Sequence, residues 1–352
     1  MPPSPQNKAV FANQLRAVAC LCVITVHLIG VFWAARDVVS GHIFAPEILG
    51  PQSRIFPFIS YSHFNLGPFG VALFFLISGF VVPMSINNAA RGRFLAARAL
   101  RIYPTYILCL LIGLVAVYCS SRYWNLPFTW TANNVWENAL LLKGIGLNSI
   151  DMVNWSLAIE LKFYLLVCVL AVWIRKGRIL PLLVLTVCVL LAVDYLPYDF
   201  IFMPYLFIGT LFSYHYQLKI SGHQLAWSAV LMMGLWTAVW PRSVLAEQFP
   251  IVTLNYFYAL AIFGIAYAYR GLFVPLRGLD FVAAISYPLY AVHPLLGYAS
   301  IRFLMDHNIA YVWALALSVA LIFGVAYLVH RAVELPTMRL GKQVLRRIAV
   351  VA

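Results

Sequence analysis

Hydrophobic and polar positions alternate along this chain on the scale of whole helices. Apolar stretches of ~17–22 residues, the length that a helix needs to cross a bilayer core, are separated by short polar segments. About ten such stretches predict transmembrane helices. They lie near residues 11–34, 66–86, 102–120, 156–174, 179–196, 200–216, 224–240, 251–269, 280–300 and 310–330. The predicted fold class is all-α: a polytopic integral membrane protein with about ten transmembrane helices, surrounded by the lipid bilayer.

The composition agrees with this prediction and excludes a soluble globular domain. Of the 352 residues, 63% are hydrophobic and only 10% are charged, and the mean hydropathy is +0.88. Soluble domains do not carry such an excess of apolar residues. The sequence has no internal repeat and no low-complexity tract, so we expect a single integral membrane domain over residues 1–352.

The basic residues predict how the chain is oriented in the membrane. If the N-terminus is inside, most of the 24 lysines and arginines fall in inner segments, including 91–101, 175–178 and 331–347. An excess of basic residues marks the cytoplasmic side, so we expect both termini in the cytoplasm and the protein in the inner (plasma) membrane. The formal net charge of +13 is then a topology signal. Because this charge is dispersed over short loops, we expect no nucleic-acid partner.

The first apolar stretch contains one arginine and one histidine, Arg16 and His27. They are eleven positions apart, which brings both side chains to within about 20° of one helix face, roughly 16 Å apart along the axis. A titratable imidazole on a helix of lipid length is costly to keep, so it is a candidate functional group. The alternative is that His27 is a hydrogen-bonded packing residue between helices.

Arginines gather in the predicted inner segment after the second stretch. Arg98 and Arg101 are three positions apart, so on a helix they project from one side. Guanidinium groups present planar, bidentate donors that suit phosphate. Such a pair could bind a phosphorylated cofactor or an anionic lipid, or it could only satisfy the inside-positive rule. Just before it, residues 78–80 and Pro83 are expected to interrupt the second helix, as is tolerated where a helix lines a cavity.

Two further polar groups lie within apolar stretches. Glu160 is about one turn inside the fourth stretch, where a carboxylate needs a partner or a wet cavity. Its alternative role is to complement the dipole at a helix N-terminus. In the ninth stretch, we expect His293, next to Pro294, to be a structural histidine bonded to a carbonyl that a proline frees. The histidines and cysteines show no metal-ligand spacing, so no metal site is predicted.

In this order, the motifs resemble the acyltransferase 3 family of membrane acyltransferases, over essentially the whole chain. The resemblance rests on the pair Arg16 and His27, the segment 74–80 with Pro83, the pair Arg98 and Arg101, the segment 155–160 with Phe163 and Tyr164, the segment 286–290 with His293, and the ending Glu334-Leu335-Pro336. Each motif alone is weak, but six in register are a strong signal.

The resemblance implies transfer of an acyl group, usually acetyl, from cytoplasmic acetyl-CoA to a hydroxyl of a cell-surface or lipid-linked glycan. In the family, the histidine that matches His27 is essential, and the arginines that match Arg16, Arg98 and Arg101 are important. We therefore expect the three arginines to hold the phosphates of acetyl-CoA at the inner face. His27 would then act as general base on the acceptor hydroxyl, with an acyl-histidine intermediate as the alternative.

Glu160 completes the expected catalytic set with His27 and Arg16. It could orient a histidine, bind the sugar or support the outer mouth of the site, and the last two roles are favoured over the first. Two other functions compete with acyl transfer. A transporter or flippase of lipid-linked saccharides would grip pyrophosphate with arginines and relay protons through His27, without transferring an acyl group. In a non-catalytic membrane module, Arg16 and His27 would only pack helices, so replacing His27 would lower abundance and activity together.

Overall fold

The computed structural model describes residues 10–56, 63–87, 89–142, 149–247, 249 and 252–346, which form helices, turns and irregular segments and contain no strand. The longer helices are α1 (Val10–Thr25), α4 (Leu66–Ile86), α5 (Arg91–Tyr123), α7 (Asn154–Val169), α9 (Leu180–Leu191), α10 (Met203–Tyr216), α11 (Gly222–Val239), α12 (Val252–Ala268), α13 (Arg277–Asp306), α14 (Tyr311–Val329) and α15 (Leu335–Arg346). The shorter segments are η2 (Val26–Val31), α2 (Phe32–Ala34), α3 (Arg36–Ile43), α6 (Ala132–Ala139), α8 (Ala171–Arg175), η4 (Tyr198–Phe202), η5 (Trp240–Arg242), η6 (Arg270–Leu272) and η7 (His330–Glu334). The predicted all-α fold class is confirmed.

Every predicted stretch coincides with one or more of these helices. Among the described residues, five helical segments are long and apolar enough to cross a membrane: Val10–Ala34, Leu66–Ile86, Arg91–Tyr123, Arg277–Asp306 and Tyr311–Leu345. Helices α9 and α12 are apolar but shorter. The protein is therefore a helical membrane protein, whereas ten crossings and a cytoplasmic location of both termini remain predictions.

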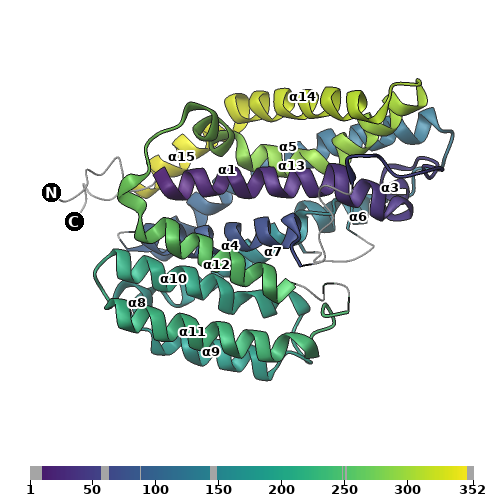
Figure 1. Cartoon of the computed structure of the whole chain (residues 1–352). Helices are drawn as coiled ribbons and strands as arrows, with labels where there is room; N and C mark the ends of the chain where they lie inside the picture. The colour runs from purple at the N-terminus through teal and green to yellow at the C-terminus, as the bar shows by residue number, and fades with distance from the viewer. Residues whose placement is uncertain are drawn as a thin grey trace.

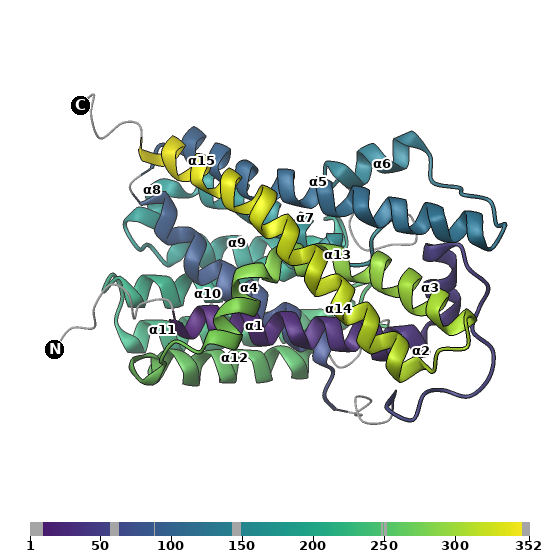
Figure 2. The same cartoon turned by 90° about the horizontal axis from the view of Figure 1, so that it is seen from above.

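Helix α1 lies in the middle of the bundle, between α13 and α4. The packing continues from α13 to α14 on one side and from α4 through α10 to α11 and α9 on the other (Figure 1; Figure 2 gives the view from above). The start of α1 and the end of α15 lie at one end of the bundle, and α3 and α6 lie at the opposite end (Figure 1). We call these the inner end and the outer end, in keeping with the predicted orientation.

The segment that carries the arginines is helical, which corrects the expected start of the third stretch. Helix α5 begins at Arg91, well before residue 102, so Arg93, Arg98 and Arg101 lie on its first turns. Arginine, alanine and leucine dominate this segment, and all three favour a helix. The hydropathy pattern missed the extension because it registers apolar length and not helix propensity.

The expected interruption of the second helix at residues 78–80 and Pro83 is wrong. Helix α4 is continuous and contains Pro83. Gly79 has a different role: a Cβ atom there would lie 2.1 Å from the carbonyl oxygen of Leu206 on α10, and the facing Gly209 is similarly crowded by α4. Facing glycines allow membrane helices to approach this closely. Gly79 therefore allows α4 to pack closely against α10.

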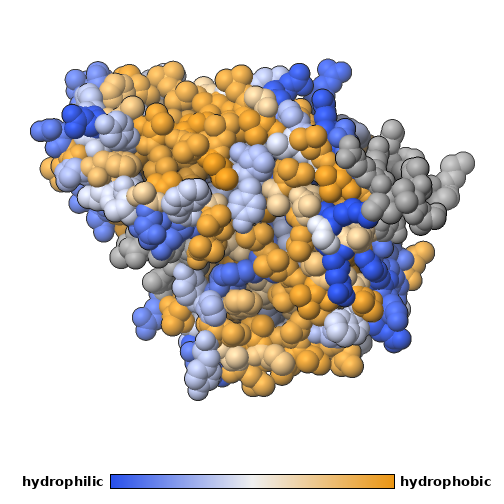
Figure 3. All heavy atoms as spheres, turned by 180° about the vertical axis from the view of Figure 1, so that it is seen from behind, coloured by the Kyte–Doolittle hydropathy of each residue, from blue (hydrophilic) through white to orange (hydrophobic). Residues whose placement is uncertain are grey.

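Large hydrophobic side chains are exposed on the outside of the bundle. Figure 3 shows hydrophobic residues over much of the face seen from behind, with hydrophilic residues gathered toward its two ends. Trp227, Trp313 and Leu191 are among the exposed apolar side chains. An apolar surface of this extent suits lipid rather than water.

Candidate active site

A cavity of about 80 Å³ lies among α1, α4, α5, α7 and α13, and we call it the arginine cavity. Its polar lining residues are Arg16, Ser78, Arg101, Ser156, Glu160, Tyr164, Ser286, Tyr287 and Tyr290. Charged and hydroxyl groups are rarely gathered inside a membrane helix bundle without a function.

Two of the three arginines that are predicted to bind acetyl-CoA line this cavity. The guanidinium groups of Arg16 and Arg101 make no hydrogen bond or ion pair with any residue that the structure describes, and they lie close enough to repel each other. Like charges in a protein interior are unfavourable unless an opposite charge lies near them. The pair therefore suits a phosphate or another anion.

The third predicted arginine, Arg98, does not line the cavity. Its Nη2 donates to Ser85 Oγ at 2.6 Å, and its guanidinium lies 5.5 Å and 5.4 Å from the ring centroids of Phe94 and Tyr164. Arg101 also lies near Tyr164, so both arginines face one side of α5, as their spacing predicts. Arg98 is held by groups of the protein, whereas Arg101 is available to a ligand.

Glu160 lies in the arginine cavity and not toward the outer end. Its Oε1 accepts hydrogen bonds from Ser78 Oγ at 2.7 Å and from Tyr164 Oη at 2.6 Å, and its charge partly balances that of Arg16. This position does not fit the two roles favoured from the sequence, sugar binding and support of the outer mouth. The reason is that residues 149–153, which precede α7, fold into the interior, so α7 begins below the surface.

Glu334 lies on η7, close enough to Arg16 and Arg101 to interact with their charges. Its direct partner is a histidine, because Nδ1 of His330 lies 2.6 Å from Glu334 Oε2. Glu334 is only 3% exposed. The ending motif thus contributes a buried carboxylate behind the arginine cavity and leaves the two guanidinium groups free.

A larger cavity of about 590 Å³ lies toward the outer end, and we call it the histidine cavity. Its polar lining includes His27, His42, Asn65, Ser149, Asp151 and Tyr290, and aromatic rings of Trp155, Phe202, Trp240, Phe249 and Tyr256 line it as well. Most of the remaining wall is aliphatic. A largely apolar cavity with a few placed polar groups is typical of a small-molecule site.

His27 lies at a local change in helix geometry. Residues Val26–Val31 form the π-helical turn η2, and the carbonyl of Leu28 within it accepts a hydrogen bond from Tyr311 Oη at 2.7 Å. Such turns often occur at functional sites. Nδ1 of His27 is buried, and it has no hydrogen-bond partner among the described residues. The described residues therefore give Nδ1 no hydrogen bond of the kind that the packing alternative requires.

A second histidine, His293 on α13, lies beside His27, with their ring centroids 5.1 Å apart. Pro294 has no amide hydrogen, so it leaves the carbonyl of Tyr290 without its helical donor, and Nδ1 of His293 bonds that carbonyl at 2.8 Å. This is the structural role predicted for His293. Because the carbonyl can only accept, Nδ1 carries the proton, and Nε2 is a buried acceptor with no partner among the described residues.

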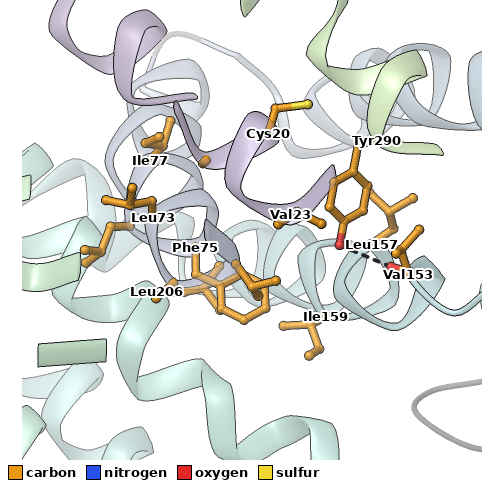
Figure 4. Packing of buried hydrophobic residues seen from close by; sticks show 14 of the residues in the cluster. Cys20, Val23, Leu73, Phe75, Ile77, Val153, Leu157, Ile159, Leu206 and Tyr290 are labelled. Carbon is orange, nitrogen blue, oxygen red and sulfur yellow. Dashed lines mark hydrogen bonds between the residues drawn. The ribbon is translucent and has the colours of Figure 1, made fainter. Parts of the chain in front are cut away.

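The two cavities meet at Tyr290 and Val71, which line both of them. Figure 4 shows the phenol ring of Tyr290 reaching from α13 toward Val153, beside Val23 of α1. Its hydroxyl lies 2.7 Å from Ser156 Oγ. Tyr290 is therefore part of the wall between the arginine cavity and the histidine cavity.

Asp151 is a residue of the histidine cavity that the sequence analysis missed. It is 1% exposed, and its Oδ1 accepts a hydrogen bond from the amide of Val153 at 3.2 Å. Burial raises the pKa of Asp151 to about 7, and the bond from Val153 opposes that shift. A signal was present in the sequence, because Asp151 is one of 11 acidic residues in the chain and closely precedes the segment 155–160.

The raised pKa of Asp151 predicts a pH-dependent stability. An ordinary aspartate titrates near about 4, so between about pH 4 and pH 7 the folded protein holds a proton that the unfolded chain has lost. Stability is therefore expected to fall as the pH rises through this window and to level off above it. In Asp151→Asn this contribution should be absent, as measured by thermal unfolding in detergent at pH 5 and pH 8. An equal drop in melting temperature in both proteins would contradict the assignment.

Comparison with known proteins supports the family that the sequence motifs predict. The model of the acyltransferase 3 family, described as an acyltransferase domain, matches residues 10–331. Nodulation protein 10 of Rhizobium leguminosarum bv. viciae is 33% identical over 133 residues, a match that spans 31% of this chain and 35% of that protein. No solved structure matches the chain. Because the family match covers nearly the whole sequence, the chain belongs to the acyltransferase 3 family.

Proposed function

We propose that this protein is an O-acyltransferase of the inner membrane. It transfers an acyl group, which we take to be acetyl, from cytoplasmic acetyl-CoA to a hydroxyl of a cell-surface or lipid-linked glycan. The observation that carries the proposal is the pair of cavities that meet at Tyr290. One contains the free guanidinium groups of Arg16 and Arg101, and the other contains His27, so a candidate anion-binding site and a candidate base lie in adjoining cavities.

The arginine cavity suits the narrow arm of the donor. Its volume of about 80 Å³ is far below the 590 Å³ of the histidine cavity, so it suits the slender pantetheine arm better than the nucleotide. Arg16 and Arg101 would hold a phosphate group at this point. Arg91 and Arg93, on the first turn of α5, lie where they can attract the remaining phosphates.

The histidine cavity suits the acceptor. Trp155, Trp240 and Tyr256 offer aromatic faces for a sugar ring, and Asp151 offers a carboxyl group for a hydroxyl. In the reaction, the acceptor oxygen attacks the thioester carbon and its proton passes to His27. The carbon–sulfur bond then breaks, CoA leaves inward, and the proton returns to the thiolate.

The sidedness of the reaction tests this proposal. Radiolabelled acetyl-CoA is added to everted and to right-side-out membrane vesicles that contain the protein, and base-labile label is measured in the glycan fraction. Label is expected only with everted vesicles, because acetyl-CoA does not cross the bilayer and the inner end then faces the medium. Vesicles without the protein are the control. Label from intact right-side-out vesicles, or from neither kind, would contradict the proposal.

Glu160→Gln is expected to bind acetyl-CoA more tightly. Glutamine keeps an oxygen that accepts from Ser78 and Tyr164, so the fold should persist, but the negative charge beside Arg16 is lost. An attraction of about 1–4 kcal/mol between the phosphates and the arginines is then less opposed, and KM for acetyl-CoA should fall severalfold. Glu47→Gln, at an exposed glutamate, is the control. A rise in KM would show instead that the carboxylate holds the arginines in place.

A further inference from the structure

Tyr290 and Ser156 form a buried hydroxyl pair that the proposed reaction has not yet used. Tyr290 is 5% exposed and Ser156 is 8% exposed, and their oxygens are 2.7 Å apart. Ser156 Oγ donates its own hydrogen to the carbonyl of Val153 at 3.0 Å. The Tyr290 hydroxyl also lies 3.4 Å from this carbonyl, but the shorter bond from Ser156 favours the tyrosine as the donor in the pair. Both acceptors within reach of its hydrogen, Ser156 Oγ and the Val153 carbonyl, could be exchanged for an acceptor atom of a ligand.

The Tyr290 hydroxyl belongs to a residue that both cavities share. Of the described residues, only Val71 and Tyr290 line both the arginine cavity and the histidine cavity, and only Tyr290 is polar. The phenol ring that carries it packs against two other rings, with its centroid 5.4 Å from that of Phe74 and 5.8 Å from that of His293. The Tyr290 hydroxyl is thus the donor that a group meets on passing from the guanidinium groups toward His27.

Acyl transfer needs a donor at this point. When the acceptor oxygen bonds to the thioester carbon, the carbonyl oxygen takes up negative charge, and the charge is released when the carbon–sulfur bond breaks. Preorganised donors aimed at such an oxygen are a large part of catalysis in acyl transfer. The role requires no net proton transfer from the donor, so a neutral phenol is sufficient.

We propose that Tyr290 Oη donates a hydrogen bond to the thioester carbonyl oxygen as charge develops on it. Ser156 holds the phenol in position in the resting protein and accepts its hydrogen until the substrate arrives. This inference rests on the proposed function and adds a catalytic residue to it. The competing explanation is structural: the Tyr290–Ser156 bond would only tie α13 to α7.

Kinetics of Tyr290→Phe distinguish these explanations. The substitution keeps the ring and removes the hydroxyl, so kcat for acetyl transfer should fall by about 10²–10³-fold, the effect of losing one oxyanion donor, with KM for acetyl-CoA nearly unchanged. Ser156→Ala should lower kcat far less, because the donor remains. Tyr298→Phe is the matched control, since Tyr298 is a buried tyrosine of the same helix that lines neither cavity.

A structural tie predicts a different pattern. Tyr290→Phe and Ser156→Ala both remove the bond between the two hydroxyls, and each removes one bond to the Val153 carbonyl. They would then have similar effects, which would follow membrane abundance and melting temperature. That result, or a wild-type kcat in Tyr290→Phe, overturns the proposed role of Tyr290. The proposed function would still stand, because the wild type and Tyr298→Phe would transfer the acetyl group. If the wild type transfers no acetyl group from acetyl-CoA, the proposed function fails and the role of Tyr290 fails with it.

Discussion

His27→Ala is expected to lose acetyl transfer by about 10²–10⁴-fold, the contribution of a positioned general base, while its abundance in the membrane stays at the wild-type level. Abundance should hold because Nδ1 of His27 has no hydrogen-bond partner among the described residues and the ring borders a cavity. The measurement is label transferred from acetyl-CoA to endogenous glycan in membranes matched by immunoblot. His223→Ala, at an exposed histidine in the first turn of α11, is the control.

This experiment also separates the three functions considered from the sequence. Loss of label at normal abundance supports His27 as the base. A parallel loss of label and abundance would assign His27 to packing, and full labelling would exclude it from the mechanism. A flippase would transfer no label even as the wild type, a result that membership of the acyltransferase 3 family argues against.

The helices could be predicted because a lipid surrounding requires long apolar runs, which hydropathy detects directly. The same criterion failed for polar helices. The first turns of α5 are rich in arginine, and α15 (Leu335–Arg346) is amphipathic and packs against α5. Both helical segments pack one side against other helices of the protein, so their polar residues are compatible with a stable helix.

The candidate site could be predicted only as far as single helices determine it. Arg16 and His27 were placed on one side of the first helix by their spacing, and each lines one of the cavities. The contact between His27 and His293 depends on how α1 packs against α13, and no spacing within one helix carries that information. Glu160 was misplaced for the same reason, because the depth of α7 is set by the buried segment 149–153.

Arg101→Gln is expected to raise KM for acetyl-CoA by about 10–100-fold, because a hydrogen bond to a charged group contributes about 1.5–3 kcal/mol and about 1.4 kcal/mol corresponds to a factor of ten. The value of kcat should change little, since Arg101 lines the arginine cavity and not the cavity of His27. With Arg16→Gln added, kcat/KM should fall by about 10³-fold or more, because both guanidinium groups line the cavity in which the phosphate is proposed to bind. Arg178→Gln, at an exposed arginine between α8 and α9, is the control.

A truncated donor shows whether the arginine cavity recognises phosphate. Acetylpantetheine keeps the thioester and the narrow arm of acetyl-CoA but has no phosphate group. If Arg16 and Arg101 bind a phosphate, their replacement should raise KM for acetyl-CoA and leave KM for acetylpantetheine unchanged. An equal rise for both donors would place the guanidinium groups on the pantetheine arm instead. Higher salt should mimic the substitutions for acetyl-CoA alone, because it screens the attraction between the arginines and the phosphates.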